Sequence, residues 1–343
     1  MKPRKAFRAA LVGADSLLLK ELKAALAELM FPLAELEFYD PGVQEEFSKL
    51  IQFGDSPKVV HNLDARLLEG LDLVFLATDP VTGRECGRLA LEKKTRAVDL
   101  SGAFIQDVRV PVVVAGVNSG PVLKDAPFLI ANPHAVTIIL SQIFRAVIPR
   151  FGLKQALAFV LQPASAFDDA GIEELAGQSV AMLSSSAVRK KIFKDQIAFN
   201  LLSHWEALDA AGFSTGERRI MDEVSRIFKR PGFPLSLSIV QAPVFHTYSI
   251  MAHLELEKKA DIGGLERLFK AHPLFRVPAR ACPVNSLGVA GQDQIFIGQI
   301  KQDPASPRGF WLWTVTDNLT FGSALNAVKI GRGLLDACLK DRA

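Results

Sequence analysis

Cysteine is scarce in this chain of 343 residues, which holds three cysteines and no Cys-x-x-Cys pair. Such a count excludes a disulfide scaffold and gives no sign of a zinc or redox centre, so we expect no metal site. An excess of one charge is also lacking, because 40 Lys and Arg stand against 37 Asp and Glu, interspersed, for a net charge of +3. A nucleic-acid-binding surface is therefore not expected.

Long hydrophobic runs are missing too, although the mean hydropathy is positive at +0.20. Apolar runs such as Leu71–Ala77 are far shorter than the roughly 20 residues of a membrane helix. The basic start, Met1–Arg8, is not followed by the apolar stretch and cleavage site of a signal peptide. The sequence therefore predicts a cytoplasmic protein without a membrane segment, long enough for two domains of roughly 100–200 residues each.

The first third of the chain alternates short apolar runs with helical patterns, which is typical of βαβ units on a parallel sheet. Leucines from Leu18 to Leu29, spaced by four, four and three, form one stripe of an amphipathic helix. Together with a glycine turn before that helix, the pattern indicates a Rossmann-type half. Strands are predicted at Ala9–Val12, Glu35–Tyr39, Leu71–Ala77, Arg96–Leu100, Val110–Ala115 and Phe128–Ala131.

After Pro133 the pattern changes to a helix from Val136 to about Val147, followed by longer alternating strands. This indicates a mixed, largely antiparallel sheet with helices on one side, before a last amphipathic helix over Phe321–Leu339. The basic cluster Arg189-Lys190-Lys191 is interpreted as a solvated helix face. Strands are predicted at Gln155–Leu161, Ser236–Gln241, Ser249–Glu257, Gln294–Ile300 and Phe310–Thr316.

Several short segments carry a resemblance to a known family. They are Val12-Gly13-Ala14, Asp99–Phe104, Val110–Val114 with Val117-Asn118, Ile130–Pro133, Ile197–Asn200, and Asp317–Leu319 with Ala324–Val328. Over nearly the whole chain, and in the right order, they resemble signatures of the aspartate-semialdehyde dehydrogenase family. Gly177–Ser179 and Val240–Phe245 resemble most closely its Usg-type branch, whose members lack the full chemistry.

The resemblance implies an α/β chain of two domains. A Rossmann-type parallel-sheet domain, residues 1–131 with 318–343, would bind a dinucleotide. An α+β domain with a mixed, largely antiparallel sheet, residues 132–317, would bind the substrate and form a homodimer. Long apolar strands such as Leu235–Val240 and Ile295–Ile300 are expected at that dimer interface.

The family's reaction needs a thiolate that forms a thioester, a general acid or base, and a nicotinamide that accepts hydride. The resemblance places Ala135 at the cysteine position and Tyr248 at the position of the general-base histidine. Gln241 stands where an arginine would clamp the substrate carboxylate, and Ile105 stands where an arginine would hold phosphate. Four roles are missing at once, so no intact catalytic set is expected.

Other positions in the substrate pocket keep the family's residue types. Gln162 matches the glutamine that orients the nucleophile, and Glu223 matches the residue that receives the substrate's amino group. The ordinary alternatives are a hydrogen-bonded amide at a strand end and a solvated helix carboxylate. His134 could act as a base or nucleophile and His246 as a shifted base, against the alternative that His134 caps a helix or lines the pocket wall.

The dinucleotide loop of the family, G-x-x-G-x-x-G, keeps only Gly13, with Ser16 and Leu19 at the later positions. A serine hydroxyl caps a helix and can touch phosphate. A later glycine-rich loop of the family is replaced by Ala77–Pro80, where Asp79 would repel phosphate. Binding of NAD or NADP is therefore expected to be weakened.

Asp40 ends the second predicted strand, 27 residues after Gly13. Rossmann proteins commonly hold the ribose hydroxyls with an acid at this point, which favours NAD over NADP if either binds. The alternative is that Asp40 hydrogen-bonds the backbone of the Pro41-Gly42 turn. The resemblance adds Asn318 to the candidate cofactor residues.

The sequence thus favours a dimeric binding or regulatory protein that has lost the thioester chemistry of its family. An active oxidoreductase with a different, non-thioester mechanism is the alternative. A third reading is a residual dehydrogenase whose nucleophile lies elsewhere in the sequence. A small-molecule ligand is expected, but the altered pocket does not name it.

Overall fold

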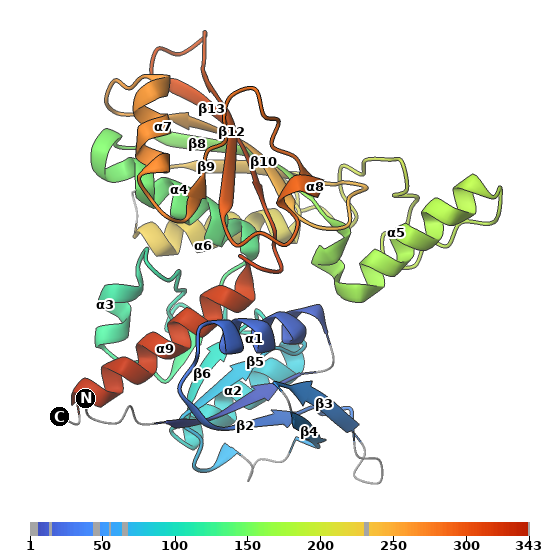
Figure 1. The fold of residues 1–343 in the computed structure, drawn as a ribbon, viewed down its shortest axis with the longest axis vertical. Helices are drawn as coiled ribbons and strands as arrows, with labels where there is room; N and C mark the ends of the chain where they lie inside the picture. Colours follow the sequence, from blue (N-terminus) through green and yellow to red (C-terminus); the bar gives the residue numbers. More distant parts are fainter. Residues whose placement is uncertain are drawn as a thin grey trace. The chain divides into compact units, whose positions relative to one another are not determined.

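The computed structural model describes residues 6–13, 16–43, 49–54, 56–63, 68–229 and 233–341. The chain divides into two compact units, Met1–Pro133 with Ser323–Ala343 and His134–Gly322. Each unit is built around one β-sheet (Figure 1).

The first unit holds a seven-stranded sheet in the order β3-β4-β2-β1-β5-β6-β7. All neighbouring pairs are parallel except β3 and β4, an antiparallel hairpin at the edge. The Rossmann-type parallel sheet is therefore confirmed. The strands are β1 (Phe7–Val12), β2 (Leu33–Tyr39), β3 (Lys49–Phe53), β4 (Ser56–His61), β5 (Leu73–Leu76), β6 (Arg96–Asp99) and β7 (Leu129–Ala131). The helices are α1 (Leu17–Glu28), α2 (Pro80–Glu92), α3 (Ser119–Lys124) and α9 (Ser323–Asp341).

The core of this unit follows from the apolar periodicity. All four residues of β5 are buried, as expected for a central parallel strand. On α1 the buried stripe includes Leu19, Leu22 and Leu26, which share one hydrophobic core with residues of α9. Gly13 follows β1 with a φ of +153°, and a Cβ there would collide with the carbonyl oxygen of Ala77. Glycine is required at this position because β1 and the end of β5 approach each other so closely.

The predicted strand Val110–Ala115 is wrong, because the segment is irregular and pairs with β7 at a single bridge only. Two backbone hydrogen bonds join it to Ala131 of β7, and side-chain amides hold it further along. The Oδ1 atom of Asn118 accepts from the Val114 N–H at 2.8 Å, and that of Asn326 accepts from the Ala115 N–H at 2.8 Å. The apolar run is buried, yet its polar backbone groups find partners outside a sheet ladder.

The sequence prediction missed the edge hairpin of β3 and β4. Both strands mix polar and apolar residues and are largely solvent-exposed, so they lack the apolar runs that indicated the central strands.

The second unit holds a six-stranded sheet in the order β11-β12-β13-β10-β8-β9. Three of its five pairs are antiparallel, and β11–β12 and β8–β9 are parallel, which confirms the mixed, largely antiparallel sheet. Helices α4, α6 and α7 lie on one side of it (Figure 1). The strands are β8 (Gln155–Gln162), β9 (Leu235–Gln241), β10 (Tyr248–Glu255), β11 (Phe275–Arg276), β12 (Ile295–Gln302) and β13 (Gly309–Thr316). The helices are α4 (Ala135–Phe151), α5 (Asp168–Leu183), α6 (Thr215–Phe228), α7 (Ile262–Lys270) and α8 (Ser286–Val289), with a 3₁₀ turn η2 (Ala164–Phe167).

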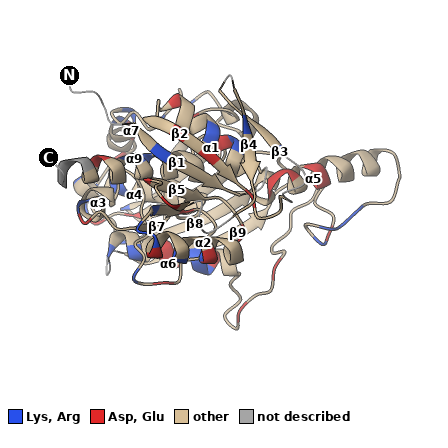
Figure 2. Ribbon diagram, turned by 90° about the horizontal axis from the view of Figure 1, so that it is seen from below, with Lys and Arg blue, Asp and Glu red and all other residues tan. Residues whose placement is uncertain are grey.

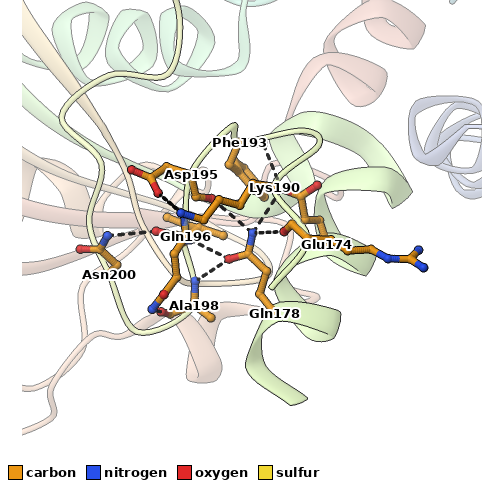
Figure 3. Close-up of polar contacts among 10 residues, drawn as sticks. Glu174, Gln178, Lys190, Phe193, Asp195, Gln196, Ala198 and Asn200 are labelled. Atoms are coloured by element: carbon orange, nitrogen blue, oxygen red, sulfur yellow. Dashed lines mark hydrogen bonds and ion pairs between the residues drawn. The ribbon is translucent and has the colours of Figure 1, made fainter. Parts of the chain in front are cut away.

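Helix α5 and the segment after it form an arm that projects from this sheet (Figure 1). Two side chains of α5 hold the returning segment, as Figure 3 shows. The Glu174 carboxylate accepts from three successive backbone N–H groups, those of residues 191–193, at 2.7–3.1 Å. Gln178, 1% exposed, accepts from the N–H groups of Ile197 and Ala198 at 2.7 and 3.2 Å. The amide of Gln178 also donates to the carbonyls of residues 189 and 195.

The basic cluster Arg189-Lys190-Lys191 is solvent-exposed, as expected, but it is not part of a helix, so the helical part of that prediction is wrong. The cluster lies in irregular chain whose backbone is held by Glu174 and Gln178 rather than by helical hydrogen bonds. Gln178 belongs to the Gly177–Ser179 segment, so this part of the Usg-type resemblance has a structural role.

Within the described ranges, every helix is too short or too polar to span a lipid bilayer. The same residues contain no group of three or more His, Cys, Asp or Glu placed to hold a metal ion. Basic and acidic residues are interspersed over helices and strands rather than gathered on one element (Figure 2).

Candidate functional site

The N-terminus of α4 is the centre of the candidate site. Ala135 is the first residue of this helix, and His134 is its N-cap. The Nδ1 atom of His134 accepts a hydrogen bond from the backbone N–H of Val136 at 3.2 Å. Because Nδ1 is the acceptor, the proton of the neutral ring belongs on Nε2. Of the roles considered from the sequence, His134 therefore has that of a capping histidine.

Glu223 on α6 joins α6 to the start of α4. Its side chain is 0% exposed, so it is not a solvated helix carboxylate. One oxygen, Oε2, accepts from the His134 N–H at 2.9 Å and from the Thr137 hydroxyl. The other, Oε1, accepts from the Arg219 Nε at 2.7 Å. The carboxylate is thus fully engaged within the protein.

Three polar side chains meet where β8, β9 and β10 lie side by side. The strand register places Gln162 opposite Gln241, whose Oε1 accepts from the Gln162 Nε2 at 3.2 Å. The Gln241 Nε2 donates to the Gln162 carbonyl at 3.1 Å, and the Tyr248 hydroxyl donates to the Gln162 Oε1 at 3.3 Å. Tyr248 also lies edge-on to His134, with ring centroids 5.9 Å apart. The structure therefore brings together five of the predicted residues, namely His134, Gln162, Glu223, Gln241 and Tyr248.

Neither ring of this site is charged near neutral pH. Burial, together with the positive charge of Arg219, lowers the pKa of the His134 imidazole to about 3. Burial raises the pKa of the Tyr248 phenol well above its ordinary value, although Arg219 opposes the shift. A general base that is poised near pH 7 is therefore not provided by either side chain.

Two other predicted site residues, Asn318 and Ile105, make contacts outside the cluster around His134. Asn318 lies after β13, and its Oδ1 accepts from the Ser165 hydroxyl at 3.1 Å and the Thr247 N–H at 3.3 Å. Thr247 has a φ of +74°, so this contact helps to hold a strained turn before β10. Ile105 belongs to the first unit and is 2% exposed there, packed as an apolar side chain.

The helix starts of the first unit are capped by their own side chains. The Ser16 hydroxyl accepts from the Leu19 N–H at 3.2 Å, as expected for an N-cap. Two other residues of the predicted glycine turn, Ala14 and Asp15, lie outside the described residues. At the start of α2, one oxygen of Asp79 accepts from the backbone N–H groups of residues 81 and 82. Hydrogen bonds from Thr82 hold the pKa of Asp79 below its ordinary value, so a negative charge already occupies that helix N-terminus.

Asp40 has the local role that the sequence left open as an alternative. Its Oδ1 accepts from the Gly42 N–H at 2.9 Å, and its Oδ2 lies 3.6 Å from the Lys49 Nζ. The residue is 7% exposed. The carboxylate therefore supports the Pro41-Gly42 turn, and Lys49 offsets part of its charge.

Sequence reasoning missed Arg219 and Thr137, the remaining partners of Glu223. Arg219 precedes Glu223 by four residues on one helix, a spacing that places an ion pair on the same face. That signal was present in the sequence. The contact of Thr137 with Glu223 had no local signal, because the two residues are 86 positions apart.

Comparisons with known proteins agree with this architecture. The semialdehyde dehydrogenase dimerisation domain matches residues 145–321. A USG-1 protein homolog of Pseudomonas aeruginosa is 30% identical over 327 residues, which cover 95% of this chain and 97% of that protein. An aspartate-semialdehyde dehydrogenase of Rickettsia bellii is 26% identical over 98% of this chain and 99% of its own. The solved structure of a probable aspartate-semialdehyde dehydrogenase from Pseudomonas aeruginosa superposes with a TM-score of 0.89, at 29% identity over 96% of this chain and 99% of that one.

Fold and site together define a two-unit protein with an NAD(P)-type Rossmann sheet and a dimerisation domain of the semialdehyde dehydrogenase type. The chain belongs to the aspartate-semialdehyde dehydrogenase family, and its similarity to a USG-1 protein homolog confirms the Usg-type resemblance.

The low pKa of His134 predicts an acid-dependent loss of stability. In the unfolded chain the ring takes up a proton near pH 6.5, whereas in the folded protein it does so only at about pH 3. Between these values the unfolded state binds more protons, so the free energy of unfolding falls as the pH is lowered. Urea denaturation at pH 7 and pH 4.5 should show a smaller decrease for His134→Asn, which keeps a capping side chain.

The matched control is His61→Asn, because His61 is an exposed histidine on β4. It should lose as much stability on acidification as the unmodified protein. An equal decrease in His134→Asn and the unmodified protein would contradict the assignment of a neutral, desolvated His134.

Proposed function

We propose that this chain is a catalytically silent member of its family, which acts as a dimeric binding or regulatory protein and forms no thioester. The observation that carries the proposal is Ala135 as the first residue of α4. A helix N-terminus lowers the pKa of a thiol placed there, which suits a cysteine nucleophile. A methyl group has no lone pair with which to attack a carbonyl.

The surroundings of Ala135 support the same proposal. Gln241, which stands where the family clamps a substrate carboxylate, is 0% exposed and is hydrogen-bonded to Gln162. Glu223, which would receive an amino group, is engaged by α4 and by Arg219. An oxidoreductase with a non-thioester mechanism remains the alternative, but it would need a base other than His134 or Tyr248 in this part of the described chain.

Restoring the nucleophile alone should not restore activity. Ala135→Cys is expected to give no phosphate-dependent reduction of NADP with aspartate semialdehyde, as for the unmodified protein, because Ile105 supplies no cation for phosphate and neither His134 nor Tyr248 supplies a base poised near pH 7. One labelled thiol more than in the unmodified protein, which already exposes Cys282, is the control that the new cysteine is present and accessible. Turnover by this single variant would show that the rest of the pocket is intact.

We propose that a dinucleotide, if bound by the Rossmann-type sheet, is held weakly and that NAD is favoured over NADP. Weak binding is supported by the loss of loop glycines at Ser16 and Leu19 and by the charge of Asp79 at the start of α2. The preference for NAD rests on the charge of the Asp40 carboxylate, which would repel a 2′-phosphate even while its Oδ1 holds the Gly42 N–H.

Calorimetry with the two dinucleotides tests the role of Asp40. The unmodified protein should bind NAD more tightly than NADP, and Asp40→Ala should narrow the difference. Lys49→Met should widen it, because Lys49 offsets the charge of Asp40. A preference of the unmodified protein for NADP would reject this assignment.

A homodimer is supported by the face of the second sheet that side chains of α4, α6 and α7 do not cover. The register pairs Met251 with both Phe159 and Trp313, so these three side chains form one row on the same face. Leu157 and Trp311 belong to the next row. Phe159 and Leu157 are 44% and 41% exposed, which is unusual for neighbouring large apolar residues. We call this set the outer face.

Of the two strands expected at the interface, β9 offers few exposed apolar side chains. β9 turns Leu237 and Ile239 inward and exposes Ser236 and Ser238. Exposed apolar residues lie on β8 instead, with half-buried ones beside them at Met251, Trp311 and Trp313 on β10 and β13. Pairing of two copies through the outer face would bury them by the closed two-fold arrangement that is commonest among soluble oligomers.

Light scattering should give twice the 37.4 kDa of one chain for the unmodified protein at micromolar concentration. Phe159→Lys should shift it toward the monomer mass, because a charge would be buried at the centre of the pairing surface. Leu91→Lys is the matched control, since Leu91 on α2 is 45% exposed and lies in the other unit. A monomer mass for the unmodified protein would refute the dimer.

A further inference from the structure

We infer that the polar cluster at the start of α4 binds a small organic carboxylate that carries no ammonium group, through the guanidinium of Arg219 and the Nε2–H of His134. The cluster comprises His134, Gln162, Arg219, Glu223 and Tyr248. The inference rests on the proposed function, because it assigns a ligand class to a site without thioester chemistry.

Glu223 cannot serve as the partner of an ammonium group. Its side chain is 0% exposed, and its two oxygens already accept from His134, Thr137 and Arg219. A ligand amine would have to displace one of these donors from a buried carboxylate. The amide oxygens of Gln162 and Gln241 are also buried, and each already accepts a hydrogen bond. The Gln162 oxygen accepts from the Tyr248 hydroxyl, and the Gln241 oxygen accepts from the Gln162 Nε2.

Arg219 offers the opposite chemistry. Only its Nε is used, for Glu223 at 2.7 Å, and among the described residues its two terminal nitrogens have no protein partner. The side chain is 29% exposed, so ligand can reach it. The Glu223 carboxylate that pairs with Arg219 also accepts from the His134 N–H, which places the guanidinium near the start of α4. A guanidinium fork pairs with a carboxylate through two parallel hydrogen bonds.

His134 adds a second donor next to Arg219. Its Nδ1 is occupied by the Val136 N–H, so the free ring nitrogen, Nε2, carries the proton. The cluster therefore presents donors on Arg219 and His134, and its ion pair with Glu223 leaves no net negative charge to attract an amine. A carboxylate is favoured at such a site, and an ammonium group beside the guanidinium is repelled.

Calorimetry of the full-length protein with succinate and with L-aspartate tests this inference, since the two dicarboxylates differ by one ammonium group. Succinate should bind at least about tenfold more tightly than L-aspartate. The double variant Arg219→Gln with Glu223→Gln replaces the ion pair by two amides without leaving a buried charge unpaired. It should lose succinate binding while its thermal unfolding stays cooperative.

Arg218→Gln is the matched control, because Arg218 is the adjacent arginine and pairs with Asp209 on the surface. It should bind succinate as the unmodified protein does. Equal or tighter binding of L-aspartate, undiminished succinate binding by the double variant, or no succinate binding by the unmodified protein would each overturn the inference. Turnover of aspartate semialdehyde would instead overturn the proposed function, whichever dicarboxylate binds.

Discussion

The buried carboxylate of Glu223 is the contact on which the candidate site depends. An isolated charge in a protein interior is strongly unfavourable, so every group around it must supply a hydrogen bond or an opposite charge. The backbone of His134, the hydroxyl of Thr137 and the guanidinium of Arg219 do so. This requirement fixes the start of α4 against α6, and with it the position of Ala135.

The ion pair of Glu223 with Arg219 is also one reason why the site carries little net charge near neutral pH. The ion pair neutralises the one carboxylate, and desolvation keeps His134 and Tyr248 uncharged near neutral pH. The two glutamines at the ends of β8 and β9 hydrogen-bond to each other rather than to solvent. The site thus orders polar groups, and neither of its rings is a base poised near pH 7.

Much of the fold was predictable because its elements are defined by local patterns. The leucine stripe of α1 and the apolar run of β5 each fill a buried position in one core, so periodicity alone located them. Val110–Ala115 has the same apolar composition as a strand but is irregular, because the amides of Asn118 and Asn326 satisfy its backbone. The prediction of a helix at Arg189-Lys190-Lys191 was wrong for a similar reason, because Glu174 and Gln178 of α5 hold the backbone of this segment.

The sequence by itself determined the fold class, the family and the alanine at position 135, because strand patterns and ordered motifs are written in neighbouring residues. It also contained the Arg219–Glu223 spacing, but it did not show that Glu223 contacts His134 and Thr137. Only the tertiary structure decided that Glu223 is buried and that His134 is a neutral cap, because these properties arise between residues 89 positions apart. Desolvation depends on what packs around a side chain, and a linear pattern does not record that packing.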